Sequence, residues 1–316
     1  GSYAVAAGVS RALGLDAERT AHAIAIAGTA LNALRVTRTG ALSHWKGLAY
    51  PHAGFGGTHA AFLAMRGVTG PLEVFEGNKG FMEAIAGDFQ IDWAGEDLER
   101  VRRTILKKYN AEIHSQSSIE GILELKAAHR FSAEEIERIE LDVFDVAYHI
   151  IGGGEEGDKT SIRSKEEADH SLPYMVAVAV LDDGVMPAQY EPARILRQDV
   201  QQLLRRVVVR PSQEYSRRFP DEMPARVRVH LRDGRVLERE KADYEGFFSR
   251  PMPWERVVEK FERLSAPYAD VALRKEIIET VAGLEHARVA ALARLLAAVA
   301  GPAAGAGQER ERSIRS

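Results

Sequence analysis

Four kinds of polar side chain crowd into the segment 169–174. Asp169, His170, Ser171 and Tyr174 supply an acid, an imidazole, a hydroxyl and a phenol, directly before the apolar run 176–181. An imidazole beside an acid is suited to general acid–base catalysis near neutral pH. The contiguous order is not that of a Ser-His-Asp hydrolase triad, whose members converge from distant positions. Asp169 is equally a candidate N-cap for the helix that follows.

A second candidate is Lys46, in the segment 43–47 that leads into apolar, glycine-rich sequence. A partly enclosed ammonium there would pair with a substrate carboxylate, and the alternative is an ordinary solvated lysine. Arg163 and Lys165, in the polar stretch before Asp169, are further candidate carboxylate clamps or solvated charges. Together these cations favour an anionic substrate.

The third candidate segment, 112–118, stands just before a predicted helix. Free N–H groups and the dipole at a helix N-terminus favour anions. Ser115 or Ser117 would cap this helix in the simplest interpretation. His114 and Gln116 in the same segment favour a ligand-binding role instead.

The sequence lacks the residue patterns needed for metal binding, for a phosphate-binding loop and for cysteine chemistry. His52 and His59 could share a helix face, but no third ligand accompanies them, so no metal site is predicted. The glycines at 152–154 are followed by acids and not by the Lys-Ser/Thr of a phosphate-binding loop. The chain has no cysteine, which excludes disulfides, thiol nucleophiles and cysteine-ligated clusters. If it catalyses a lyase reaction, side chains must do the acid–base work.

Composition bounds the class of protein. The chain has 316 residues, a net charge of −4 and 45% hydrophobic residues, as expected of a globular protein with one large or two ordinary domains. This charge gives no global attraction to nucleic acid or anionic membrane. No apolar run reaches the roughly 20 residues of a membrane span. Without cysteines or a visible secretory signal, the sequence favours a cytoplasmic protein.

Hydrophobic periodicity indicates an α+β fold. We predict a mainly helical, discontinuous domain over 3–130 and 251–300, a smaller α/β lid domain inserted at 131–250, and a disordered tail over 301–316. The predicted helices are 3–15, 17–34, 44 or 53 to 66, 97–108, 117–129, 172–181, 199–204, 254–264, 270–281 and 287–299, and the predicted strands are 139–146, 207–209, 225–231 and 236–241, the last two joined at Asp233-Gly234.

Local signals mark some of these elements. Asp16 is a plausible N-cap, and the segment 132–135 carries a capping-box signature without the ideal register. Gly54, Gly56 and Gly57 lie in the third predicted helix, where the missing Cβ would let either another helix or a ligand approach closely.

Over about residues 3–300 the sequence resembles the MmgE/PrpD family. The resemblance rests on SHWKGLA at 43–49, VTGP at 68–71 with FEG at 75–77, KYNAEIHSQ at 108–116, ADHSLPYMVA at 168–177, and MPARV at 223–227 with Asp233-Gly234. It implies a helical domain plus an α/β lid with the active site between them, no cofactor and usually a homodimer.

The best known member of this family is 2-methylcitrate dehydratase, and relatives include cis-aconitate decarboxylase and an iminodisuccinate epimerase. The segment 169–175 is more similar to the dehydratase branch, which belongs to propionate metabolism. The expected function is therefore the dehydration of a small hydroxy-tricarboxylate such as 2-methylcitrate. The alternatives are a decarboxylase, epimerase or isomerase acting on a related polycarboxylate.

By motif, Lys46 and His170 match positions implicated in the family's active site, and His114 and Gln116 lie in a motif thought to line it. Lys46 would hold a carboxylate, and His170 would act as base or acid. The predicted catalytic residues are Lys46, His170 and Tyr174, and the predicted substrate-binding residues are His114, Gln116, Asp169, Ser171 and Arg163.

The sequence departs from the family pattern at its start. Family members normally continue further at the N-terminus, with helical sequence that carries more polar active-site residues. We therefore expect a fragment, a split enzyme whose second chain supplies the missing half, or a non-catalytic subunit. Each of these would expose apolar helix faces in the isolated chain.

Overall fold

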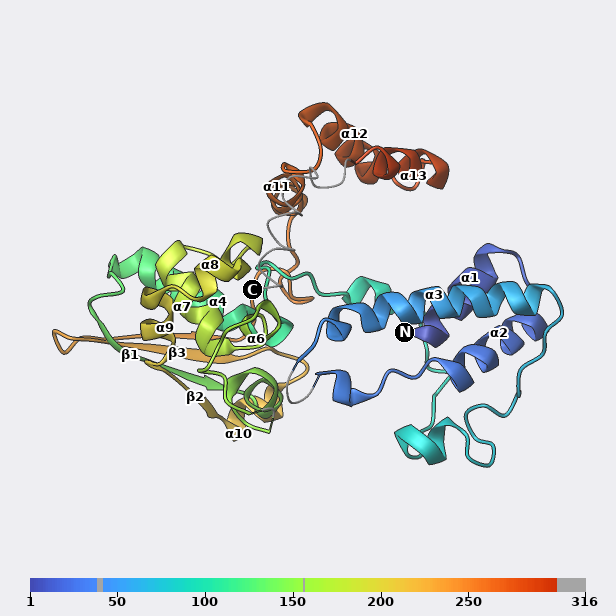
Figure 1. Ribbon diagram of the computed structural model, residues 1–316, viewed down its shortest axis with the longest axis horizontal. Helices are drawn as coiled ribbons and strands as arrows, with labels where there is room; N and C mark the ends of the chain where they lie inside the picture. The colour runs from blue at the N-terminus through green and yellow to red at the C-terminus, as the bar shows by residue number, and fades with distance from the viewer. Residues whose placement is uncertain (39–41, 156, 300–316) are drawn as a thin grey trace, which may run out of the picture.

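The computed structural model describes residues 1–38, 42–155 and 157–299 (Figure 1). It mixes helices with one four-stranded sheet, as the α+β prediction requires. We call residues 2–65 the helical unit and residues 109–250 the α/β unit; a C-terminal helical segment follows (Figure 1). Among the described helices, none combines the length and apolarity that crossing a membrane requires.

The elements follow the chain in three groups. The helical unit contains α1 (Ser2–Ala12), α2 (Ala17–Ala30), η1 (Arg35–Arg38) and α3 (Trp45–Met65), and the connection to the next unit contains η2 (Met82–Ala86) and η3 (Arg100–Arg103). The α/β unit contains η4 (Ile113–Ser115), α4 (Gln116–His129), β1 (Ile136–Val143), α5 (Asp145–Ala147), η5 (Tyr148–Gly152), α6 (Lys165–Ala168), α7 (Leu172–Asp182), η6 (Pro187–Tyr190), α8 (Pro192–Ile195), α9 (Gln198–Leu204), β2 (Val207–Pro211), α10 (Gln213–Arg218), β3 (Ala225–Leu231) and β4 (Val236–Lys241). The C-terminal helices are α11 (Trp254–Ser265), α12 (Val271–Ala282) and α13 (Val289–Ala297).

The sheet has the strand order β2-β1-β3-β4. Strand β1 pairs with β2 in parallel and with β3 antiparallel, and β3 and β4 form the predicted hairpin around Gly234, whose φ is 88°. Along β3 the side chains alternate, so that Val227 and Val229 are buried while Arg226 and Arg228 are partly exposed. This alternation gives the sheet one apolar face, which α4 and α7 cover (Figure 1).

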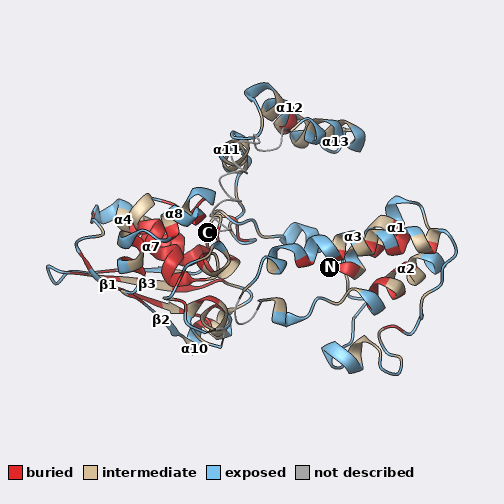
Figure 2. Cartoon of the chain, viewed as in Figure 1, coloured by how far each residue is buried: buried red, intermediate tan, exposed pale blue. Residues whose placement is uncertain are grey.

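Helix α7 is the centre of the α/β core. All residues from Leu172 to Val180 are buried, as predicted for a short buried helix (Figure 2). Helix α4 contributes Ile119, Ile122 and Leu125 to the same core. This packing associates α4 with the sheet, whereas the predicted division of the chain into domains remains a prediction.

The helical unit packs through small residues. Asp16 caps α2 as predicted, its side chain accepting a hydrogen bond from the Arg19 backbone at 2.9 Å. At Gly57 of α3 an added Cβ would lie 2.8 Å from the Ser2 carbonyl oxygen, and at Gly56 it would lie 2.5 Å from the Leu31 side chain. We had predicted that these glycines allow close approach of either another helix or a ligand. At Gly56 and Gly57 the close neighbours are other segments of the protein.

One predicted helix is wrong, and one predicted strand is confirmed only in part. The helix expected over 97–108 is replaced by irregular chain around η3, because the Asp97 carboxylate accepts the Glu99 N–H at 2.8 Å and Leu98 adopts a φ of 58°. The strand expected over 139–146 ends at Val143, and the following residues turn into α5. The segment 132–135 starts no helix, although Ser132 N–H does bond the Glu135 carboxylate at 2.7 Å.

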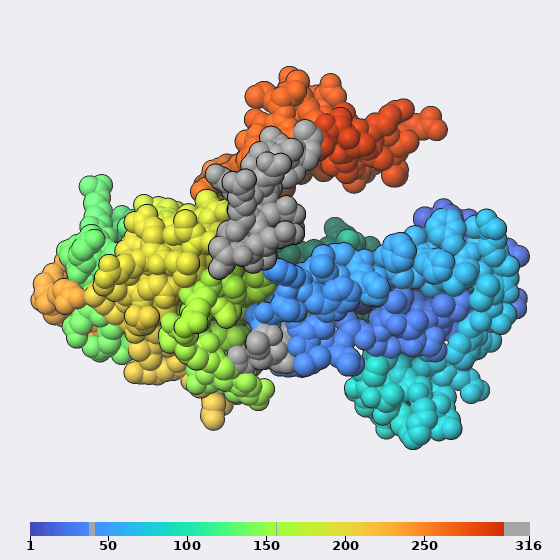
Figure 3. All heavy atoms as spheres, in the orientation of Figure 1, coloured from blue at the N-terminus to red at the C-terminus, as the bar shows by residue number. Residues whose placement is uncertain are grey.

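The C-terminal helices form close to where they were predicted. In Figures 1 and 3, α11–α13 stand apart from α1–α3. Helix α11 has its apolar residues on one side, yet none of its residues is buried. The discontinuous helical domain and the lid therefore remain predictions, and the tail over 301–316 lies outside the described residues.

Candidate active site

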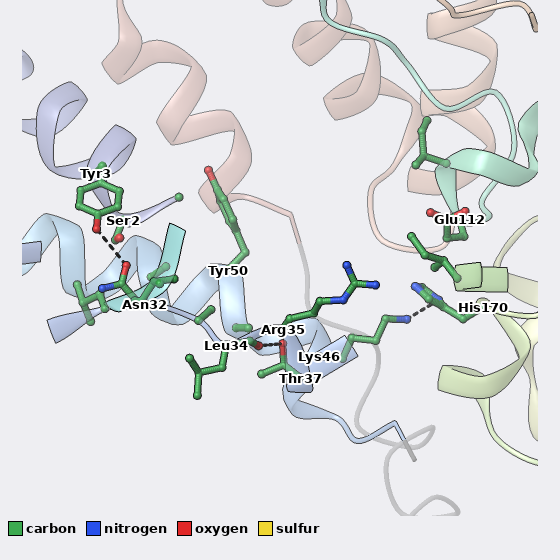
Figure 4. Close-up of a pocket in the computed structure, with 18 of the residues that line it drawn as sticks. Ser2, Tyr3, Asn32, Leu34, Arg35, Thr37, Lys46, Tyr50, Glu112 and His170 are labelled. Atoms are coloured by element: carbon green, nitrogen blue, oxygen red, sulfur yellow. Dashed lines mark hydrogen bonds between the residues drawn. The ribbon is translucent and has the colours of Figure 1, made fainter. Parts of the chain in front are cut away.

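A cavity of about 890 Å³ opens where the helical unit meets the α/β unit (Figure 4). Its helical wall comes from α1, the segment after α2, and α3, while the α/β wall comes from 112–114 and His170. Its polar lining residues include Tyr3, Asn32, Arg35, Thr37, Lys46, Tyr50, Glu112, His114 and His170, and its apolar ones include Leu31, Leu34, Phe81, Ile85, Ile113 and Ile150.

Lys46, Asp169 and His170 form a cluster at the junction of the two units. Lys46 lies in the first turn of α3, and its ammonium donates to Asp169 Oδ1 at 3.0 Å and contacts His170 Nδ1 (Figure 4). The same His170 nitrogen lies 2.5 Å from Asp169 Oδ1. Because Asp169 caps the end of α6 and His170 precedes α7, both side chains leave the backbone between two helices. The fold thus joins residues 123 and 124 positions apart.

The surroundings set the charges of this cluster. Burial lowers the pKa of Lys46, and the charge of Asp169 and its hydrogen bond oppose that shift. Burial alone would raise the pKa of Asp169, but hydrogen bonds and charges from His170 and Lys46 outweigh it and lower that pKa to about 2. Asp169 is therefore a fixed anion at neutral pH that holds a cation and an imidazole beside the cavity.

A second imidazole–carboxylate pair faces the same cavity. His114 Nδ1 lies 2.8 Å from Glu112 Oε1, and the His114 ring meets Phe144 and Phe219 edge-on at centroid distances of 5.5 and 5.9 Å. His114, which we predicted as a substrate-binding residue, thus lies in the cavity lining. Our site prediction omitted Glu112, although its place two residues before His114 was a usable signal.

Other predicted site residues lie elsewhere. Tyr174 is fully buried, and its hydroxyl donates to the Gln189 carbonyl. The Gln116 amide holds the preceding loop, accepting from Tyr109 N–H at 2.9 Å. Neither residue is among those that line the cavity. A direct contact of Tyr174 or Gln116 with a substrate in this cavity therefore does not follow from the structure.

Ser171 and Arg163 also have other surroundings. The Ser171 hydroxyl caps α7 by accepting from Tyr174 N–H at 3.0 Å, and it donates to the Lys159 carbonyl at 2.6 Å. Arg163 is exposed and is absent from the cavity lining. Ser171 thus orders the backbone beside His170, which is an indirect contribution to the site.

The segment after α2 supplies residues that sequence reasoning missed. Asn32 accepts a hydrogen bond from the Tyr3 hydroxyl at 3.1 Å, and Arg35 points toward His170 (Figure 4). Our predicted helix continued to residue 34, whereas α2 ends at Ala30. No residue pattern marked this early end, and neither side chain was among the predicted site residues.

Metal binding has little basis in the described residues. No group of three or more His, Asp or Glu side chains within the described ranges is arranged to hold an ion. The His52 ring contacts the Trp45 ring in a tilted arrangement, at a centroid distance of 5.4 Å. The cavity lining includes an amine, two imidazoles and a carboxylate, from Lys46, His114, His170 and Glu112.

Comparisons with known proteins agree on the family. The MmgE/PrpD C-terminal domain matches residues 109–286, and the MmgE/PrpD N-terminal domain matches residues 1–94. Cis-aconitate decarboxylase of Mus musculus is 25% identical over 276 residues, which cover 83% of this chain and 53% of the relative. The Homo sapiens protein of the same name is 25% identical over 305 residues, covering 90% and 59%.

A 2-methylcitrate dehydratase of Escherichia coli O157:H7 is 26% identical over 204 residues, covering 58% of this chain and 38% of the relative. The chain spans about half the length of the curated relatives that it matches. Since the C-terminal domain match alone covers more than half of the chain, and the N-terminal domain match precedes it, the chain belongs to the MmgE/PrpD family.

Proposed function

We propose that this chain carries the site of a lyase that acts on a small polycarboxylate by side-chain acid–base chemistry. The observation that carries the proposal is the Lys46–Asp169–His170 cluster, whose lysine and histidine face a cavity of about 890 Å³. Similarity to 2-methylcitrate dehydratase supports dehydration of a hydroxy-tricarboxylate such as 2-methylcitrate.

In this dehydration a base first removes the proton α to a carboxylate. The electron pair of that C–H bond becomes the new C=C bond, and the C–O bond breaks as the hydroxyl leaves with a proton, as water. Lys46 would hold the carboxylate and stabilise the developing enediolate, with His170 as base or acid. Asp169 would orient both groups, since it contacts both.

Decarboxylation is the second candidate, because two of the reported relatives are named cis-aconitate decarboxylase. In that reaction a carboxylate leaves as CO₂, its C–C electron pair moves into the conjugated system, and an acid protonates carbon. The same lysine and imidazole would serve. An epimerase or isomerase of a related polycarboxylate is a further alternative.

The test measures turnover by the purified chain. With 2-methylcitrate, ultraviolet absorbance reports the conjugated unsaturated acid; with cis-aconitate, released CO₂ reports decarboxylation. We expect Lys46→Ala and His170→Ala each to reduce turnover by ~10²–10⁴-fold with an unchanged circular dichroism spectrum. Lys79→Ala is the matched control, since this exposed lysine lies outside the cavity lining.

Near-normal turnover in both site variants would refute the assignment. A folded chain that is inactive on every polycarboxylate would favour the non-catalytic subunit. It would also prompt a search for a second chain that completes the site.

We further propose that the chain forms a homodimer and that α11–α13 pack against other helices of the helical domain. Analytical ultracentrifugation of the purified chain tests the dimer.

A further inference from the structure

Glu112 holds its neighbour His114 at two points. One carboxylate oxygen, Oε2, accepts the His114 backbone N–H at 2.7 Å, and the other, Oε1, lies 2.8 Å from the ring nitrogen Nδ1. The Glu112 side chain is only 9% exposed. A carboxylate buried this deeply is stable only with such partners.

The contacts select one form of the imidazole. An ionised carboxylate only accepts hydrogen bonds, so the nitrogen facing it must carry the proton. His114 Nδ1 is buried and makes no well-aligned hydrogen bond with any described residue, so its 2.8 Å approach to Glu112 Oε1 is a close electrostatic contact; the side chain as a whole is 14% exposed. The accessible part of the ring therefore lies away from Nδ1. Edge contacts with Phe144 and Phe219 restrict the ring further.

Glu112 also interacts electrostatically with the cluster of Lys46, Asp169 and His170. Burial would raise its pKa, but hydrogen bonding to His114 and the charges of His114 and His170 outweigh this and lower it. Glu112 and both histidines line the same cavity. Two imidazoles, each beside its own carboxylate, thus line the cavity, one from η4 and one from the turn between α6 and α7.

We infer that Glu112 is a positioning residue that fixes His114 in the Nδ1–H form, so that Nε2 is the second proton-transfer group of the site. The inference rests on the proposed lyase function, which needs one group to take a proton and another to give one. In a dehydration, one imidazole would take the proton from carbon. The other would protonate the departing hydroxyl, and the C–H electron pair would form the double bond.

The test reads the tautomer directly, by ¹⁵N NMR of histidine-labelled full chain, with His114→Gln and His170→Gln variants to assign the signals. We expect His114 in the wild-type chain to be the Nδ1–H form. In Glu112→Gln we expect a mixture of both tautomers, because an amide can either accept or donate. Asp169→Asn is the matched control, and it should alter the His170 signals while leaving the His114 tautomer unchanged.

A kinetic arm separates positioning from mere folding. Glu112→Gln should lower kcat by roughly 10²-fold with little change in KM, and Glu112→Asp should recover part of the loss. A wild-type Nε2–H tautomer, or a His114 tautomer unchanged in Glu112→Gln, would overturn the inference. Absence of wild-type turnover would count against the proposed lyase function, whereas the tautomer measurement would still decide what Glu112 does.

Discussion

The α/β unit and the helical unit bury side chains of different sizes. The α/β core contains large residues such as Ile139, Leu141 and Tyr174, all fully buried. The buried cluster of the helical unit consists of six alanines, namely Ala6, Ala23, Ala27, Ala60, Ala61 and Ala64. Large side chains on α3 are nevertheless exposed to solvent, with Phe55 74% and Tyr50 60% exposed.

This difference has consequences for stability and for the site. Burying a leucine or isoleucine stabilises a fold by ~1.5–3 kcal/mol, and burying a single methyl by much less. The α/β unit therefore contributes most of the hydrophobic stabilisation, while α3 exposes large apolar side chains to solvent. The cavity takes Lys46 from the weaker unit and His170 from the stronger one. The geometry of the site thus depends on how firmly the helical unit is held.

The largest stability effect should come from the α/β core. Ile139→Ala removes most of a fully buried side chain from β1 and should cost ~2–5 kcal/mol. Ala61→Gly, at a fully buried position of α3, should cost only ~1 kcal/mol. Peptide-resolved hydrogen exchange should show faster exchange across the α/β unit in the first variant. Equal loss of protection in α1–α3 would mean that the two units unfold together, contrary to this comparison.

Acid should act on the α/β unit through Glu120. This buried carboxylate bonds Lys108 and Lys241, both at 2.9 Å, and Arg250. Burial would raise its pKa, but these partners outweigh it and lower the pKa to about 2. Because the folded-state pKa is depressed, the stabilisation is present above about pH 4.5 and is lost as pH falls toward 2, up to about 3 kcal/mol.

Urea unfolding at pH 7, 4 and 3 measures this loss. Glu120→Gln should be less stable at pH 7 and should flatten the pH dependence, whereas Glu18→Gln on the exposed surface of α2 should change neither. A Glu120→Gln chain with the wild-type pH slope would contradict the assigned role.

The smallest effects concern two glycines of one helix. Gly57→Ala should destabilise the helical unit by ~1–3 kcal/mol, because the new Cβ would lie 2.8 Å from the backbone oxygen of Ser2. Gly54→Ala meets nothing within 4 Å and should stabilise α3 by up to ~1 kcal/mol through helix propensity. Thermal melting of both variants should give shifts of opposite sign. Shifts of the same sign would show that α1 does not pack closely on α3.

Local patterns were sufficient for much of the secondary structure. The hairpin around Gly234, the buried helix α7 and the Asp16 cap follow from alternation, continuous apolarity and capping chemistry. The helix predicted over 97–108 failed because a short-range bond from Asp97 competes with helical bonding, and periodicity does not register such bonds.

For the site, the sequence determined which kinds of group are available, namely Lys46, His170 and His114 near helix starts. Tertiary structure decided which of the candidates meet. Tyr174 was predicted with His170, but α7 is apolar on all sides, so Tyr174 packs into the core while His170 stays outside the helix. The contact of Lys46 with Asp169 joins residues 123 positions apart, and Arg35 reaches the cavity only because α2 ends early. Such contacts depend on how whole units pack, and a local pattern of residues does not predict that packing.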